Sequence, residues 1–533
     1  MNKFFFSGLL FLLVSITQSF GQKMTDAIQF AYEDLIWDVP GDPILQKAFE
    51  IPDGYLVFRK HAIRGPGGYN YFIEKLDNNL KRTDFIDISA DIDERNYFVE
   101  EIVKFADKYF IVTSKQLRDI STEEYYIQEV DWEAGKVGKR ELVFKYKYEG
   151  RRSNMSMFVR TSPNDNFMLF TFSYSAKLQT FTRRQLEADT RTFIVFDSEM
   201  EEVEREESVE MKVDDYSFSI DQTIISDEGV IYLLGDRVIE ERDDERFTSI
   251  LKFNRGDLIA NRINFSEGVL TDLSLKLNKE GNLYGGGYYY EDEGRGSGYG
   301  VVVMAVDPDT GEPLSISTQL IDKEMLIEGL SDKEKARIER RESFGKETKQ
   351  VHDLDVRQIV THKDGSVSLI GENWDIVVTT TVDANGNRST TVTYVYKELF
   401  VTRISPEGEI ISTVKMPKKY SGKADLQKSF HAMDMDNDLG IIFYDNRQNL
   451  IEIGPKGVLP YTRKSKKTAL SLVRVSPDGK QTREGIIDYA MKPYSSYRHY
   501  RFNIDMEVID EDKMLFVTYY GKKKFGYALA TPK

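Results

Sequence analysis

The sequence predicts an all-β protein that folds as a single β-propeller of about eight four-stranded blades. Three observations predict this fold: a recurring unit of four apolar strands and two tight turns, 32 Phe and 30 Tyr spread along the chain, and a last unit that stops one strand short. Aromatic side chains cover a pleated surface well and are typical of strands. Repeated four-stranded antiparallel units are typical of blades stacked around an axis.

The N-terminus has the pattern of a secretory signal. Lys3 supplies a positive charge, residues 4–14 form an apolar run, and small residues follow around Gly21. The run is too short to span a bilayer comfortably. We therefore predict a signal peptide at 1–21, a propeller domain at 22–533, no transmembrane segment after cleavage, and export to the periplasm or the medium. The alternative is a buried N-terminal strand or helix.

The repeat is clearest between Ser217 and Phe265. Strands lead into and out of a first turn at Asp227-Glu228-Gly229 and a second turn at Arg255-Gly256-Asp257. Glycine and asparagine tolerate the positive φ that tight hairpin turns need. The first turn recurs near Asp53, Asp107, Asp165, Glu280, Asp364, Leu439 and Glu511. The alternatives to a propeller are a pair of β-sandwiches or a solenoid of hairpins.

The last unit offers three strands, at Arg501–Ile509, Lys513–Tyr520 and Lys524–Thr531. The segment Asp26–Trp37 precedes the first full unit and can supply the fourth strand. Pairing of the N- and C-terminal strands in one blade would close the ring and leave no free edge. This count gives eight blades, or seven if the weak unit at Asp107 is misread.

One segment departs from the β pattern. Residues 322–345 are rich in Glu, Lys and Arg, and Ser331 followed by Glu334 is typical of a capping box. We predict a helical insertion between two blades, packed on one side of the ring.

In composition and turn pattern the chain resembles the broad class of secreted bacterial β-propeller proteins. The resemblance covers nearly all of the mature chain, but neither a Trp-Asp repeat nor a kelch double glycine runs through it. It implies a fold and a binding platform, and it implies no particular reaction.

Counting back from each first turn places a polar residue at one level of the first strand, where a propeller strand approaches the central channel. These residues are Ser156, Ser219, Thr271, Asp355, His431 and Asn503. We predict that they form a ring of hydrogen-bonding groups at the channel mouth. The alternative is a channel lining that is polar without holding a ligand.

Basic residues gather in segments predicted to lie on the same face. They are Arg151, Arg152, Arg463, Lys464, Lys466, Lys467 and Arg498. In a chain with a net charge of −16, such a group could bind an anionic glycan or an acidic protein surface. The alternative is ordinary solvated loop charge. The net negative charge argues against nucleic acid as a partner.

Motifs for chemistry are few. With 0 Cys there is no thiol nucleophile, and no phosphate-binding loop or metalloprotease motif is present. No cofactor is predicted, except that His352, Asp353, Asp355 and His431 are candidates to hold a divalent cation at the channel mouth. The segment 434–440 is similar to an acidic calcium loop, but a turn explains it better. The leading prediction is a non-catalytic propeller that binds a protein or glycan on its loop-rich face, and the alternative is a polysaccharide hydrolase or lyase.

Overall fold

The computed structural model describes most of the chain. The described residues are 28–32, 36–37, 43–62, 69–93, 96–148, 155–174, 190–238, 247–291, 298–344, 353–382, 388–422, 429–451, 453–461, 467–488, 497–498, 506–509, 512–520 and 524–532. The predicted signal segment lies outside them. No helix within these ranges is long and apolar enough to cross a membrane.

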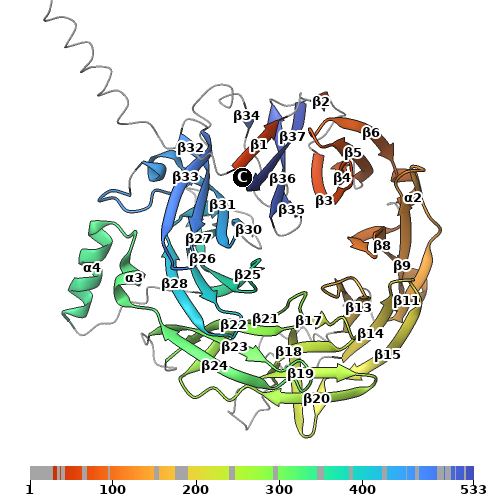
Figure 1. Cartoon of the computed structure of the whole chain (residues 1–533), viewed down its shortest axis with the longest axis horizontal. Coiled ribbons are helices and arrows are strands. Elements are labelled where there is room, and N and C mark those ends of the chain that lie inside the picture. The colour runs from red at the N-terminus through yellow and green to blue at the C-terminus, as the bar shows by residue number, and fades with distance from the viewer. Residues whose placement is uncertain are drawn as a thin grey trace, which may run out of the picture.

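The described strands form eight antiparallel sheets, which are the blades of a propeller (Figure 1). The first four blades follow the chain order. Blade 1 consists of β3 (Pro43–Ile51), β4 (Gly54–Ala62), β5 (Tyr69–Asp77) and β6 (Arg82–Asp87). Blade 2 consists of β7 (Phe98–Phe105), β8 (Lys108–Leu117), β9 (Thr122–Asp131), β10 (Lys136–Val137) and β11 (Glu141–Lys147). Blade 3 consists of β12 (Met155–Thr161), β13 (Phe167–Tyr174), β14 (Thr190–Asp197) and β15 (Glu202–Glu210). Blade 4 consists of β16 (Lys212–Val213), β17 (Tyr216–Ile225), β18 (Ile231–Arg237), β19 (Thr248–Asn254) and β20 (Asp257–Arg262).

The remaining blades continue the same order around the ring. Blade 5 consists of β21 (Val269–Leu277), β22 (Leu283–Tyr290), β23 (Tyr299–Val306) and β24 (Pro313–Leu320). Blade 6 consists of β25 (Asp353–Thr361), β26 (Val367–Val382), β27 (Arg388–Ile404), β28 (Ile410–Met416) and β29 (Tyr420–Gly422). Blade 7 consists of β30 (His431–Met435), β31 (Asp438–Asn446), β32 (Thr468–Val475) and β33 (Gln481–Asp488). Blade 8 consists of β34 (Tyr497–Arg498), β35 (Met506–Ile509), β36 (Lys513–Tyr520) and β37 (Lys524–Pro532), with β1 (Ile28–Tyr32) and β2 (Ile36–Trp37). The predicted fold and blade count are confirmed, and the weak unit at Asp107 is blade 2.

Tight turns join strands that differ in burial: inner strands such as β13, β14 and β23 are buried over most of their length, whereas an outer strand such as β15 is mostly exposed. At the first turn of blade 1, Gly54 has φ of 149°, and a Cβ there would lie 1.9 Å from the Leu76 carbonyl oxygen. Only glycine fits this backbone without moving β5. The predicted calcium-like segment is also a turn, in which Asp436 and Asn437 have positive φ between β30 and β31.

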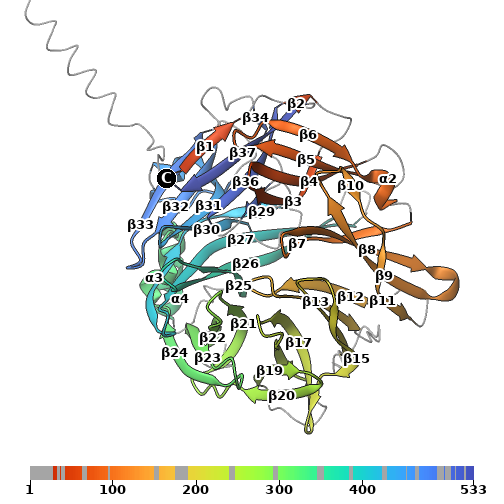
Figure 2. The ribbon, with the colours of Figure 1, turned by 45° about the vertical axis from the view of Figure 1, so that its right-hand side comes forward.

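The first strands of the blades lie side by side around the axis, and Figure 2 gives an oblique view of them. Contacts join β35 to β3, β3 to β7, β7 to β12, β12 to β17, β17 to β21, β21 to β25, and β25 to β30. Each of these strands starts at the face that carries the connections between second and third strands, which we call the loop face. The short turns between first and second strands lie on the opposite face, the turn face.

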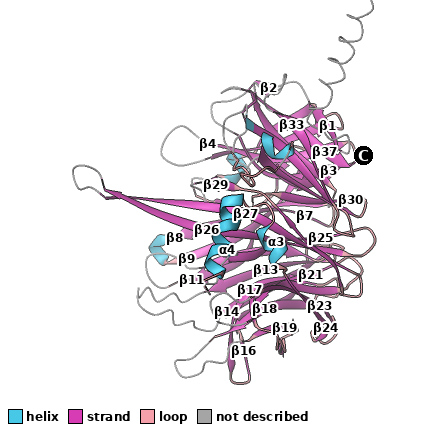
Figure 3. Cartoon of the chain, turned by 90° about the vertical axis from the view of Figure 1, so that its left-hand side faces the viewer, coloured by secondary structure: helices cyan, strands magenta, loops and turns pink. Residues whose placement is uncertain are grey.

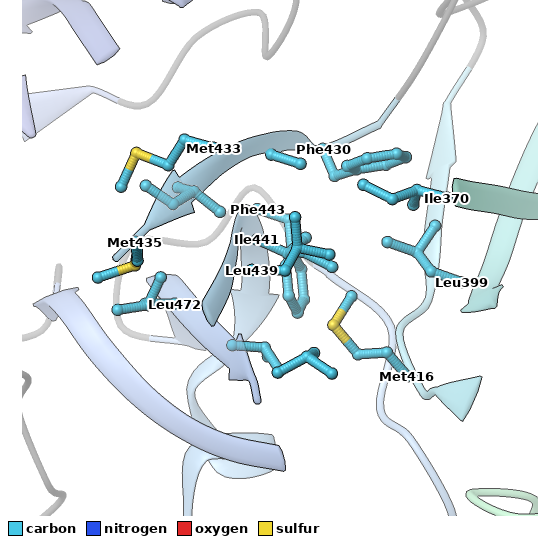
Figure 4. Close-up of a cluster of buried hydrophobic side chains, with 14 of the residues drawn as sticks. Ile370, Leu399, Met416, Phe430, Met433, Met435, Leu439, Ile441, Phe443 and Leu472 are labelled. Carbon is cyan, nitrogen blue, oxygen red and sulfur yellow. The ribbon is translucent and has the colours of Figure 1, made fainter. Parts of the chain in front are cut away.

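The hydrophobic core lies between blades rather than inside any one of them. Seven clusters of buried side chains within the described residues link neighbouring blades all the way around the ring. The largest contains residues of blades 6, 7 and 8, among them Leu399, Met416, Phe430, Met433 and Ile441 (Figure 4). A single blade could not bury both of its faces, so the ring is the unit that provides the core.

The ring is closed by strands from both ends of the chain. Strand β1 pairs antiparallel with β37, as the segment Asp26–Trp37 predicted, and β2 pairs with the start of β37. A buried polar network also joins blade 8 to blade 1. In it, the Tyr527 hydroxyl donates to Glu74 Oε2, and Arg59 contacts Glu74 Oε1 at 2.5 Å. Closure therefore combines backbone pairing with a charged side-chain contact.

Two features project from the ring. The predicted helical insertion consists of α3 (Lys323–Ile327) and α4 (Asp332–Glu342), and both hydrogen bonds of the Ser331–Glu334 capping box are present. Strands β26 and β27 extend beyond the other strands of blade 6 as a hairpin, which we call the arm (Figure 3). The short elements α2 (Ser89–Ile92), η1 (Arg118–Ile120) and η2 (Arg447–Leu450) lie in connections.

Candidate functional site

The structure places five of the six predicted channel-mouth residues near the starts of first strands, at the loop face. Ser156, Ser219, Thr271, Asp355 and His431 lie on β12, β17, β21, β25 and β30. Ser156 and Thr271 are exposed, Ser219 and Asp355 are half-buried, and His431 is buried. Asn503 lies outside the described residues. Five consecutive blades therefore carry these residues at a similar level, and their role as a ring of ligand-binding groups stays a prediction.

A β-bulge recurs in the first strands of five blades. Five first strands each carry one extra residue that has no partner in the register with the second strand. These residues are Gln46, Glu100, Asp221, Thr271 and Arg357. A bulge redirects neighbouring side chains and is common beside functional sites. The sequence prediction counted residues back from the first turn of each blade and assumed strands without bulges. It therefore named Thr271 and did not name Asp272 or Arg357.

The richest cluster lies where blades 5 and 6 meet. Trp374 donates its indole N–H to Asp355 Oδ2 at 2.7 Å, and Arg357 Nη2 lies 3.2 Å from the same oxygen. The Arg357 guanidinium is also 5.4 Å from the centre of the Trp374 ring. The Asp355 side chain is 34% exposed and that of Arg357 is 17% exposed. An aromatic face, a carboxylate and a guanidinium are thus held together within reach of solvent.

Asp272 completes this cluster from blade 5. Its Oδ2 accepts a hydrogen bond from the Val356 N–H at 2.5 Å, which ties β21 to β25. Burial raises the pKa of Asp272 to about 7, and the charges of Asp355 and Asp221 raise it further, against the Val356 hydrogen bond and Arg357. A carboxyl group with such a pKa can donate or accept a proton near neutral pH.

A buried ion pair supports the cluster from behind. Lys418 Nζ lies 2.5 Å from Glu372 Oε1, and the Ser429 hydroxyl donates to that oxygen. Arg357 Nε lies 3.7 Å from the other oxygen of Glu372. Glu372 is fully buried, so its charge is held in place, and it helps to fix the guanidinium of Arg357.

A second group of polar residues forms an Asp-His-Ser chain of hydrogen bonds, as in a catalytic triad. His362 Nδ1 lies 2.5 Å from Asp434 Oδ1, and His362 Nε2 lies 2.8 Å from Ser368 Oγ. All three residues are buried, and Ser368 is only 1% exposed. A nucleophilic serine must contact its substrate. The constellation is therefore a structural link between blades 6 and 7 on the turn face.

The predicted basic residues fall mostly outside the described part of the chain. Arg151, Arg152, Arg463, Lys464 and Lys466 are not described, and only the backbone of Arg498 is described, in β34. Lys467 is exposed just before β32. The basic surface stays a prediction.

The predicted cation site at the channel mouth stays a prediction as well. Its member His352 lies outside the described residues. Within the described ranges, no group of three or more His, Asp or Glu side chains is arranged to hold a metal ion.

Eight radial sheets, a core between blades and a strand contributed by the opposite terminus define the class: this is a β-propeller protein. No known family and no curated protein matches the sequence. Among solved structures, it is similar to the β-propeller domain of the trilobed protease from Pyrococcus furiosus, with 12% identity, TM-score 0.35, and coverage of 86% of this chain and 98% of that one.

Two further solved structures are similar to the chain. The polysaccharide lyase Uly1 has 10% identity and a TM-score of 0.36, with coverage of 81% of this chain and 89% of that one. The α-L-arabinanase of Penicillium chrysogenum has 10% identity and a TM-score of 0.28, with coverage of 57% of this chain and 99% of that one.

Proposed function

We propose that the protein is an exported glycan-binding β-propeller whose sugar site lies at the loop face of blades 5 and 6. The observation that carries the proposal is the cluster of Trp374, Asp355 and Arg357. An indole face packs against the apolar face of a sugar ring, while carboxylate and guanidinium groups exchange hydrogen bonds with hydroxyls. Binding sites combine apolar surface with a few fixed polar groups in this way. Export rests on the signal pattern at 1–21.

The charge of the cluster favours a neutral glycan. Asp221, Asp272 and Asp355 are carboxyl groups, whereas Arg357 is the cation that contacts Asp355. An anionic sugar would be repelled by this surplus of carboxylates. Binding of an anionic glycan would instead depend on the predicted basic residues.

A specific observation favours a second candidate function, cleavage of a polysaccharide. Asp272 has a pKa of about 7 and lies close enough to Asp355 for the two charges to interact. Pairs of carboxyl groups with separated pKa values serve as acid and base in glycoside hydrolysis. In this version the bound glycan is also the substrate.

The test is a screen of the mature chain against neutral and acidic oligosaccharides, followed by calorimetric titration of the best ligand. Trp374→Ala should weaken binding at least tenfold, roughly 1.4 kcal/mol. Trp374→Phe should retain most of the affinity because it keeps a ring face. Phe344→Ala is the matched control, since this aromatic residue is 70% exposed and follows α4.

Product analysis separates the two functions. A reducing-end assay on the bound glycan should detect no product if the protein only binds, whereas cleavage that Asp272→Asn abolishes would establish the second candidate. Failure to bind any neutral glycan, or equal losses in the Trp374→Ala and Phe344→Ala variants, would contradict the proposal.

A further inference from the structure

Blade 2 carries a pair of glutamates near the loop face, away from the cluster of blades 5 and 6. Glu100 is the bulge residue of β7, and Glu123 is the second residue of β9. Strand β8 lies between them. Its Ser114 hydroxyl donates to Glu100 Oε1 at 2.5 Å, and its Gln116 amide donates to Glu123 Oε1 at 3.3 Å.

Glu123 is buried without a compensating cation. It is 5% exposed, and its Oε2 has no hydrogen-bond partner within the part of the chain that the structure describes. No ion pair to Glu100 or Glu123 occurs among those residues either. In contrast, the fully buried Glu74 contacts Arg59 and Arg82, and the fully buried Glu372 contacts Lys418.

A buried carboxylate with no cation beside it is costly, because the charge loses its hydration without gaining an ion pair. The neighbouring groups respond to this charge. Burial raises the pKa of Glu100, and the charge of Glu123 adds to the effect. Burial also raises the pKa of Tyr125, and the charges of Glu123 and Glu100 and a hydrogen bond with Glu123 raise it further. The Tyr125 hydroxyl therefore stays neutral beside the two glutamates.

We propose that Glu100 and Glu123 form a binding site for a divalent cation, with calcium as the ion that fits best. The two carboxylates and the Ser114 hydroxyl offer hard oxygen ligands, and water would complete the shell. Calcium accepts such irregular sets, whereas magnesium demands a near-ideal octahedron. Zinc prefers nitrogen and sulfur ligands, which this group lacks.

The affinity follows from the small number of charged ligands. With two carboxylates, we expect a Kd of about 0.1–1 mM, in the range of extracellular calcium modules. A bound ion would join β7 to β9 across β8 and neutralise the buried charge of Glu123. This inference is independent of glycan binding.

The experiment starts from the full mature chain, freed of metal by a chelator and dialysed. Calcium chloride at 10 mM should raise the Tm by about 1–3 °C, whereas potassium chloride of equal ionic strength should not. Calorimetric titration should give one site. Terbium should bind in its place and show luminescence excited through tyrosine, which Tyr125→Phe should reduce.

Glu123→Gln and Glu100→Gln should each weaken calcium binding at least tenfold. Glu129→Gln is the matched control, because this exposed residue lies on the same strand and pairs with Lys108. The metal-free Glu123→Gln variant should be at least as stable as the metal-free parent, since it removes an unpaired buried charge. A flat calcium titration of the parent, an equal loss in Glu129→Gln, or marked destabilisation of metal-free Glu123→Gln would overturn the proposal.

Discussion

At the scale of single residues, one bulge decides which carboxyl group enters the candidate site. Thr271 is the extra residue of β21, so Asp272 resumes the pairing opposite Tyr288 and meets the Val356 N–H of β25. Two adjacent polar residues, Thr271 and Asp272, interrupt the alternation of this strand and were the signal available in the sequence. It could not show which of the two residues faces blade 6, because that depends on the bulge.

The pKa of Asp272 leads to a pH-dependent stability. Its pKa is about 7 in the folded protein against an ordinary value of 3.8. The folded state therefore binds more protons than the unfolded state between these values, and stability is lost as pH rises through 7. The variant Asp272→Asn lacks this carboxyl group. We therefore expect the difference in Tm between the variant and the parent to shift in favour of the variant by about 2–4 °C as the pH rises from 4 to 8.

Thermal unfolding at several pH values measures this effect. Asp257→Asn, an exposed aspartate at the start of β20, is the control and should follow the parent. A constant difference in Tm between Asp272→Asn and the parent across this range would show that the Asp272 carboxyl has an ordinary pKa.

At the scale of elements, the arm contributes little to the core. Beyond Trp374 the side chains of β26 become exposed, with Val378 at 60% and Val382 at 61%, and β27 pairs with it along its length. A two-stranded hairpin that buries so little is marginally stable by itself. The rest of blade 6 holds its base, where β29 pairs with β27 at 394–396.

Removal of the arm should leave the propeller intact. We would replace residues 377–393 with Asn-Gly, which joins Ile376 to its cross-strand partner Tyr394 through a tight turn. Because few buried contacts are lost, the Tm should change by less than about 2 °C. Differential scanning calorimetry checks this, and a fall of more than about 5 °C would show that the arm packs on the ring.

At the scale of the whole molecule, stability depends on closure between blade 8 and blade 1. The Tyr527 hydroxyl of β37 contacts Glu74 of β5, and the charge of Glu74 is shared with Arg59 and Arg82. Burial raises the pKa of Tyr527 far above its usual range, so the hydroxyl remains a donor. One hydrogen bond thus joins residues from opposite ends of the sequence.

Tyr527→Phe should lower the free energy of unfolding by about 1–3 kcal/mol, since it leaves a buried oxygen of Glu74 without its donor. Tyr216→Phe is the control, because Tyr216 is partly exposed on β17. Denaturant unfolding measures both. Equal stability of the Tyr527→Phe variant and the parent would mean that this contact does not hold the ring closed.

The sequence by itself determined the class of fold, the helical insertion and the closing strand, and it left the blade count at eight or seven. These depend on the tight turns between short apolar runs, the Ser331–Glu334 capping box, and a last unit with three strands. The turn and capping signals act over a few residues, and the closing strand was predicted from the repeat, because each full unit has four strands.

Only the tertiary structure decided which polar side chains meet. Asp272, Arg357 and Trp374 come together through bulges and through the packing of blade 5 on blade 6. The buried Glu123 is recognised as uncompensated only when the neighbours on β7 and β8 are known. The physical reason is that the burial and charge of a group depend on contacts between strands that are distant in sequence, which no local pattern records.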